Sequence, residues 1–104
     1  MVARAWTMDR RCTAALTAVD RLESELRPRR DGCNVTRIVH LCRLIEHDVG
    51  RSEGVGEKLG ALLQQAFALE HAGSLSASEA TRARLIFLIS CESIRSIINR
   101  LRAN

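Results

Sequence analysis

Apolar residues recur along the first part of the chain at the spacing of one helix face. The intervals between them, counted from Met8, alternate between four and three residues, which is typical of an amphipathic α-helix. We expect Thr7 to cap this helix, with Asp9 favourably placed in the first turn. We expect Arg27-Pro28 to end it, because the residue before a proline avoids the helical region. The apolar stripe consists of Met8, Cys12, Ala15, Val19, Leu22 and Leu26.

Two further stripes follow, each bounded by turn residues. After the basic turn RPRRDG, residues 27–32, a second helix is predicted from Asn34, a good N-cap, to Val49, with Gly50 as its stop. A third is predicted from about Gly54 to Ala72, with Gly73 closing it. The apolar positions of these two helices are Val35, Ile38, Cys42, Ile45 and Val49, and Val55, Leu59, Leu62, Ala66 and Leu69.

The last helix is the longest that the pattern predicts. Ser76-Ala-Ser-Glu79 matches a capping box, in which the two side chains satisfy free backbone amides at a helix start. The segment then continues to about Arg102 without glycine or proline, a length of about 40 Å at 1.5 Å per residue. We therefore predict an all-α protein with one domain, residues 1–104: a small bundle or array of about four helices with a long C-terminal helix.

This last helix carries apolar residues on two opposite sides. Its core side holds Ala83, Phe87, Cys91, Ile94, Ile97, Ile98 and Leu101. The opposite side holds Leu85, Leu88 and Ile89, together with Glu92, Arg95 and Asn99. Three arrangements would cover it: a central position for the helix, a homodimer, or binding of a different protein. We take the following as the candidate partner or dimer interface: Leu85, Leu88, Ile89, Glu92 and Arg95.

Composition indicates an ordinary folded protein. The chain is 46% hydrophobic and 27% charged, and its apolar residues are mainly Leu, Ile and Ala, which favour helices. The N-terminal sequence lacks a signal-like apolar segment and no stretch approaches a membrane span, so we expect a cytoplasmic protein without a membrane contact. In a reducing compartment the cysteines are expected to be free, buried thiols: Cys12, Cys33, Cys42 and Cys91.

The histidines and acids do not combine into a recognisable catalytic or metal-binding motif. His40 and His47 share a helix face but lie about 10 Å apart, too far to bind one metal by themselves. His40 and Cys42 point about 160° apart around the helix. A phosphorelay histidine would need a nearby lysine, which VHLCRLIEHDVG lacks, and the acids that flank His47 point to different sides. We therefore predict no enzyme activity, no metal and no cofactor.

The charge distribution keeps nucleic-acid binding open as the alternative function. The net charge is +4, and residues 1–45 carry nine arginines against five acids. Such a basic surface can contact phosphates, and the candidate residues are Arg27, Arg29, Arg30 and Arg37. Against this, aromatic residues make up 3% of the chain, which leaves little for base stacking, and no short helix-turn-helix pair is evident. Binding to another protein is the preferred interpretation.

The chain resembles a family of small bacterial regulators. It is short and all-helical, lacks catalytic residues and ends in the long helix LIFLISCESIRSIINRL, residues 85–101. In size and helical pattern it is similar to the antiactivators of LuxR-type quorum-sensing regulators, of the QslA and TraM kind. That resemblance implies a protein that binds a transcription factor stoichiometrically. An apolar helical face would occupy the regulator's surface and prevent its dimerisation or DNA binding.

Overall fold

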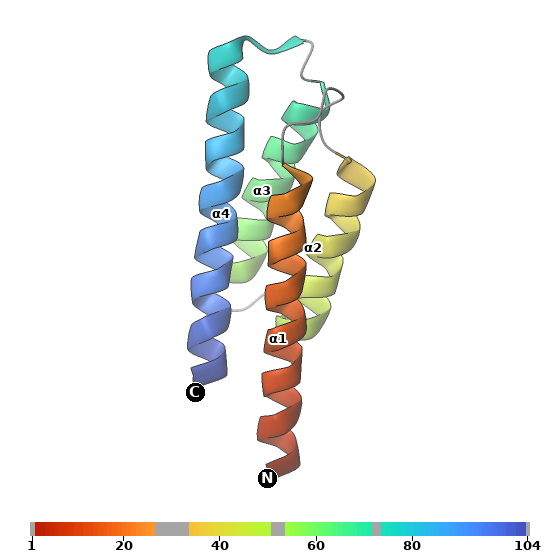
Figure 1. Cartoon of the computed structure of the whole chain (residues 1–104), viewed down its shortest axis with the longest axis vertical. Helices are drawn as coiled ribbons and strands as arrows, with labels where there is room; N and C mark the ends of the chain where they lie inside the picture. Colours follow the sequence, from red (N-terminus) through yellow and green to blue (C-terminus); the bar gives the residue numbers. More distant parts are fainter. Residues whose placement is uncertain (1, 27–33, 51–53, 72–73, 104) are drawn as a thin grey trace.

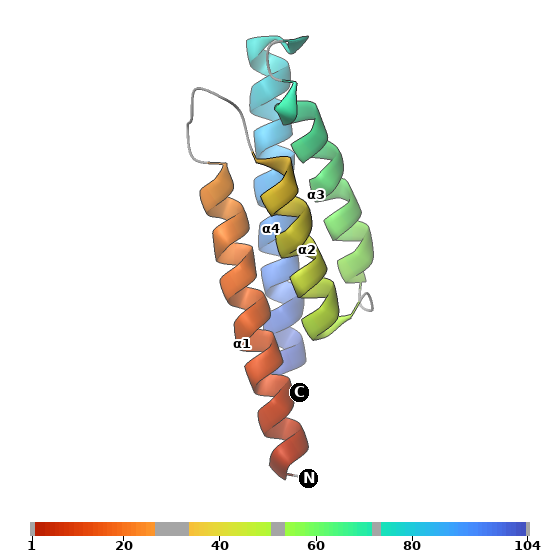
Figure 2. The ribbon, with the colours of Figure 1, turned by 90° about the vertical axis from the view of Figure 1, so that its right-hand side faces the viewer.

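The computed structural model describes residues 2–26, 34–50, 54–71 and 74–103, with side chains from residue 8 onward. These residues form four α-helices: α1 (Val2–Glu25), α2 (Val35–Val49), α3 (Val55–Glu70) and α4 (Ala77–Ala103). The helices run alternately up and down, and each packs against two neighbours, with α1 and α3 both touching α2 and α4 (Figures 1 and 2). The predicted all-α bundle with a long C-terminal helix is confirmed.

Local hydrogen bonds explain where the last three helices begin or end. The Asn34 side chain accepts a hydrogen bond of 3.1 Å from the Arg37 amide, and Gly50 ends α2 with a φ of 77°, a conformation that glycine adopts at little cost. The predicted capping box opens α4: the Ser76 amide donates to Glu79 Oε1, and the Glu79 amide donates to Ser76 Oγ, both at 3.1 Å. These bonds from Ser76 also hold the pKa of Glu79 below its ordinary value.

The third helix is slightly shorter than predicted. It runs from Val55 to Glu70, so Gly54 lies just outside it as the N-cap residue, with a φ of 85°. At the other end His71 is the C-cap, and its amide donates to the Ala68 carbonyl. The predicted closing residue, Gly73, lies outside the described residues. Differences of one or two residues at a helix end are ordinary, because the last turn frays.

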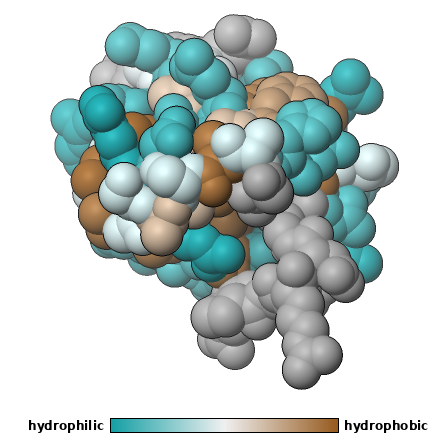
Figure 3. Space-filling view, turned by 90° about the horizontal axis from the view of Figure 1, so that it is seen from above, coloured by the Kyte–Doolittle hydropathy of each residue, from teal (hydrophilic) through white to brown (hydrophobic). Residues whose placement is uncertain are grey.

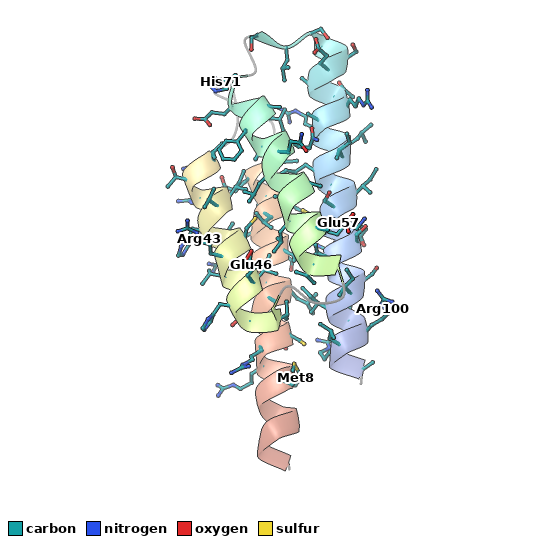
Figure 4. All side chains as sticks on the ribbon, turned by 180° about the vertical axis from the view of Figure 1, so that it is seen from behind. Met8, Arg43, Glu46, Glu57, His71 and Arg100 are labelled. Carbon is teal, nitrogen blue, oxygen red and sulfur yellow. The ribbon has the colours of Figure 1, made fainter. Side chains whose placement is uncertain are left out.

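Two predictions for the first helix are wrong. Thr7 is not its cap, since α1 already begins at Val2; the residues before Thr7 include no glycine or proline that would stop it. Met8 is not a core residue, because its side chain is 43% exposed. It lies on the part of α1 that extends past the end of α2 (Figure 4). At the other end α1 stops at Glu25, and the predicted stop at Arg27-Pro28 lies outside the described residues.

The apolar stripes of all four helices meet in one core. Apart from Met8, every position of the predicted stripes is buried or partly buried; the partly buried ones are Val35, Val49 and Leu101. Cys12, Cys42 and Cys91 are free thiols inside this core, whereas Cys33 lies outside the described residues. Burial raises the pKa of Cys42 and of Cys91 to about 12, so both stay protonated and unreactive at neutral pH.

Candidate functional site

The side of α4 that points away from the bundle exposes three large apolar side chains. Leu85 is 55% exposed, Leu88 41% and Ile89 63%, whereas Ile94 on the core side is fully buried. We call these three residues the outer face of α4. Seen along the bundle, apolar surface reaches the left-hand edge of the molecule, the side on which α4 lies in Figure 1 (Figure 3). The described helices therefore cover α4 on one side, and the central arrangement considered above does not apply within the subunit.

Arg95, which the sequence placed with this face, instead joins α4 to α1. Its guanidinium donates to Asp20 Oδ1 at 2.9 Å and contacts Glu23 Oε1 at 2.6 Å, and it also pairs with Glu92 on its own helix. Partial burial by itself would lower the pKa of Arg95, but these acceptors outweigh burial and the net effect is a rise. Arg95 thus borders the outer face and fixes it to the bundle, while Glu92 remains exposed.

A second anchor lies at the other end of the outer face, one residue before Leu85. The Arg84 guanidinium donates a hydrogen bond of 3.0 Å to the Leu26 carbonyl, which satisfies a backbone acceptor at the end of α1. With Arg95, it ties α4 to α1 above and below Leu88. The outer face is therefore carried by a helix whose position is fixed at two points, so it is a preformed surface.

A groove between α1 and α2 has a volume of about 490 Å³. Glu25, at 6% exposure, lies in its wall and accepts a 3.1 Å hydrogen bond from Arg37 through Oε1. Its Oε2 has no partner among the described residues and is shielded from solvent. The carboxylate therefore joins the two helices, and it is almost fully buried. The residues that line the groove are Arg21, Ser24, Glu25, Arg37, His40, Leu41 and Leu44.

One of the candidate nucleic-acid contacts, Arg37, lines this groove. Arg37 is 61% exposed, but its guanidinium is already paired with the buried Glu25 carboxylate. A phosphate contact would compete with that pair and leave a buried charge without its partner. The other three candidates, Arg27, Arg29 and Arg30, lie outside the described residues. Of the four predicted contacts, Arg37 is therefore the one that the described residues include, and it is paired within the fold.

The histidines lie apart from one another. His40 lines the groove between α1 and α2, and His71 is at the C-terminal end of α3, away from Arg43 and Glu46 of α2 (Figure 4). In the part of the chain that is described, no three His, Cys, Asp or Glu side chains lie where they could hold one metal ion. None of the described helices combines the length and the apolar character needed to cross a membrane.

Sequence reasoning located the exposed apolar residues of α4 but missed the ion pairs that border them. A hydropathy stripe identifies which side of a helix is apolar, and it identified Leu85, Leu88 and Ile89. It cannot show that Arg95 reaches acids on α1, because that contact joins residues 75 positions apart. Comparison of the chain with protein-family models, with curated proteins and with solved structures finds no match.

Proposed function

We propose that this chain is a non-catalytic protein-binding module, and that the outer face of α4 is its docking surface. The observation that carries the proposal is the exposure of Leu85, Leu88 and Ile89 side by side on a helix whose opposite side packs into the core. Covering one such side chain contributes about 1.5–3 kcal/mol when it goes from exposed to buried. An apolar cluster on a helix fixed to its bundle fits the way one helix docks on another protein.

The remaining chemistry of the described residues supports the same proposal. Three cysteine thiols are buried, and burial raises the pKa of each, so none of them is a ready nucleophile. The ion pairs of Glu25 and Arg95 join helices to one another. The features that remain available at the surface are apolar side chains and solvated charges, which suit binding.

We extend the proposal to the class of partner implied by the resemblance of the chain to quorum-sensing antiactivators: a LuxR-type transcriptional regulator. In this scheme an apolar surface helix of the regulator covers the outer face of α4. The regulator then loses its own dimerisation or its DNA binding.

The proposal is tested by adding the purified chain to a complex of such a regulator with its promoter DNA. We expect the wild-type chain to release the DNA, and Leu88→Glu to lose this effect because it places a charge at the docking surface. Leu44→Glu is the matched control, since Leu44 on α2 is 39% exposed and Leu88 is 41% exposed. No release by the wild type would contradict the regulator proposal, and equal loss in both variants would contradict the assignment to α4.

The alternative, nucleic-acid binding, is separated by a gel-shift titration at several salt concentrations. The proposal predicts no retarded band with DNA or RNA. A retarded band whose affinity falls steeply as salt rises would favour the alternative, because such a slope reports phosphate contacts.

A further inference from the structure

Leu85 and Ile89 of the outer face lie at the centre of a longer line of exposed residues with coiled-coil spacing. The line steps by four and three residues alternately, as the seam between two paired helices does. Each of its members is exposed. The line consists of Ser78, Arg82, Leu85, Ile89, Glu92 and Ser96.

This line is symmetric in chemical character about position 87. Leu85 and Ile89 lie two positions from that centre, and both are apolar. Arg82 and Glu92 lie five positions from it on opposite sides, and their charges are opposite. Ser78 and Ser96 lie nine positions from it, and both are small and polar. A line with this symmetry is complementary to a copy of itself that runs in the opposite direction.

We propose that a second copy of this chain covers the outer face of α4, with the two α4 helices antiparallel and a two-fold axis beside position 87. Leu85 then packs on Ile89 of the partner subunit, and Arg82 pairs with Glu92 of the partner subunit. The two-fold axis generates each contact twice, which closes the assembly as a dimer. The inference rests on the proposed function of the outer face and names the occupant of this face when no regulator is bound.

Both charged groups are available for this contact. The Arg82 guanidinium forms no ion pair with another described residue. The Glu92 carboxylate is 67% exposed and contacts Arg95 through Oε2, so its second oxygen can accept from the partner's Arg82. A parallel pairing in register would instead place Arg82 beside the same arginine of the other copy, and Glu92 beside the same glutamate, which is repulsive. The charges therefore favour the antiparallel arrangement.

A charge-complementation experiment tests this pairing. Sedimentation equilibrium is run on Arg82→Glu, on Glu92→Arg and on an equimolar mixture of the two. Each variant alone brings two like-charge pairs together in its homodimer, and we expect its dimer affinity to fall at least about tenfold. In the mixture, the heterodimer restores an opposite-charge pair at both contacts, so dimers should return with an affinity close to that of the wild type.

Arg100→Glu is the matched control for these charge changes. Arg100 is exposed and points to the same side of α4 as Arg82, but it lies 13 positions from the centre. Its counterpart, position 74, comes before α4 begins at Ala77. We expect this variant to dimerise like the wild type, and circular dichroism should show the same helical content in every variant.

Other outcomes overturn the inference in distinguishable ways. A wild type that is monomeric up to high concentration contradicts the proposed dimer. The titration of the regulator–DNA complex then tests the docking surface separately. If charge reversal has no effect but Leu85→Glu separates the dimer, the outer face pairs in a different register and the proposed pairing is wrong. A dimer that resists Leu85→Glu as well is built elsewhere, which contradicts this inference and leaves the docking surface to be tested by the regulator titration.

Discussion

The two sides of α4 should tolerate the same substitution, glutamate for an apolar residue, to very different degrees. Ile94 is fully buried, so Ile94→Glu loses about 1.5–3 kcal/mol of apolar burial. The introduced carboxyl group must also be neutralised in the core, which at pH 7 costs about 4 kcal/mol, because its ordinary pKa is about 4.3 and each unit is worth about 1.4 kcal/mol. The total is comparable to the whole stability of a small domain, about 5–15 kcal/mol, and we expect Ile94→Glu to unfold the subunit.

Leu88→Glu should leave the same subunit folded. Leu88 is already 41% exposed, so a glutamate at this position can extend its carboxylate into water and keep its charge solvated. We expect a loss of less than about 1.5 kcal/mol, a fraction of the burial of one leucine. The Ile94→Val variant, expected to cost about 0.5–1.5 kcal/mol, controls for disturbance of the core without a charge.

The assay is urea unfolding followed by circular dichroism at protein concentrations where the wild type is monomeric. Working at low concentration removes the contribution of association from the free energy of unfolding. The reasoning would be refuted if Leu88→Glu and Ile94→Glu lowered that free energy equally. Such a result would mean that α4 is covered on both sides within one subunit.

Three further predictions concern the core and its boundaries. Arg37→Met should lower the free energy of unfolding by about 1–3 kcal/mol, because it leaves the buried Glu25 carboxylate without its donor; urea unfolding measures this, and adding Glu25→Gln should recover part of the loss. Burial raises the pKa of Cys42 and of Cys91 from the ordinary 9.0 to about 12, so the protonated thiols stabilise the folded state. Their contribution to the free energy of unfolding is complete below pH 9 and is lost between pH 9 and 12, at up to about 1.4 kcal/mol per pH unit for each thiol. Replacing both cysteines with alanine should flatten the pH dependence of stability in that range. Gly60→Ala, at an exposed α3 site where nothing lies within 4 Å of the added carbon, should raise the free energy of unfolding by about 0.5–1 kcal/mol, and thermal unfolding would show it.

Local signals in the sequence were sufficient to predict most of the helical architecture. The N-cap Asn34 and the capping box Ser76–Glu79 act within one helical turn, so a short stretch of sequence contains all the partners of each motif. The alternation of three and four residues between apolar positions also reports burial directly, provided that other helices are present to cover the stripe. At Met8 that condition fails, because this part of α1 extends past the end of α2.

Contacts between helices account for what could not be predicted. The burial of Glu25 depends on Arg37, which belongs to a different helix, and a carboxylate beside an apolar stripe is ordinarily solvated. Arg95 was expected at a partner interface because of its angle on α4, but two acids on α1 lie within its reach. Periodicity describes one helix at a time, so it places a charged residue on a side of the helix without identifying the charge that it meets.

The central claim, that the outer face of α4 is an interaction surface, is tested most directly by methyl NMR of the wild type over a range of concentrations. Self-association through this face predicts that the methyl signals of Leu85, Leu88 and Ile89 shift with concentration, while those of the buried Ile94 and of Leu44 on α2 stay in place. Concentration-dependent shifts centred on Leu44, or no shift at any of the three outer-face residues while the chain forms dimers, would contradict the account.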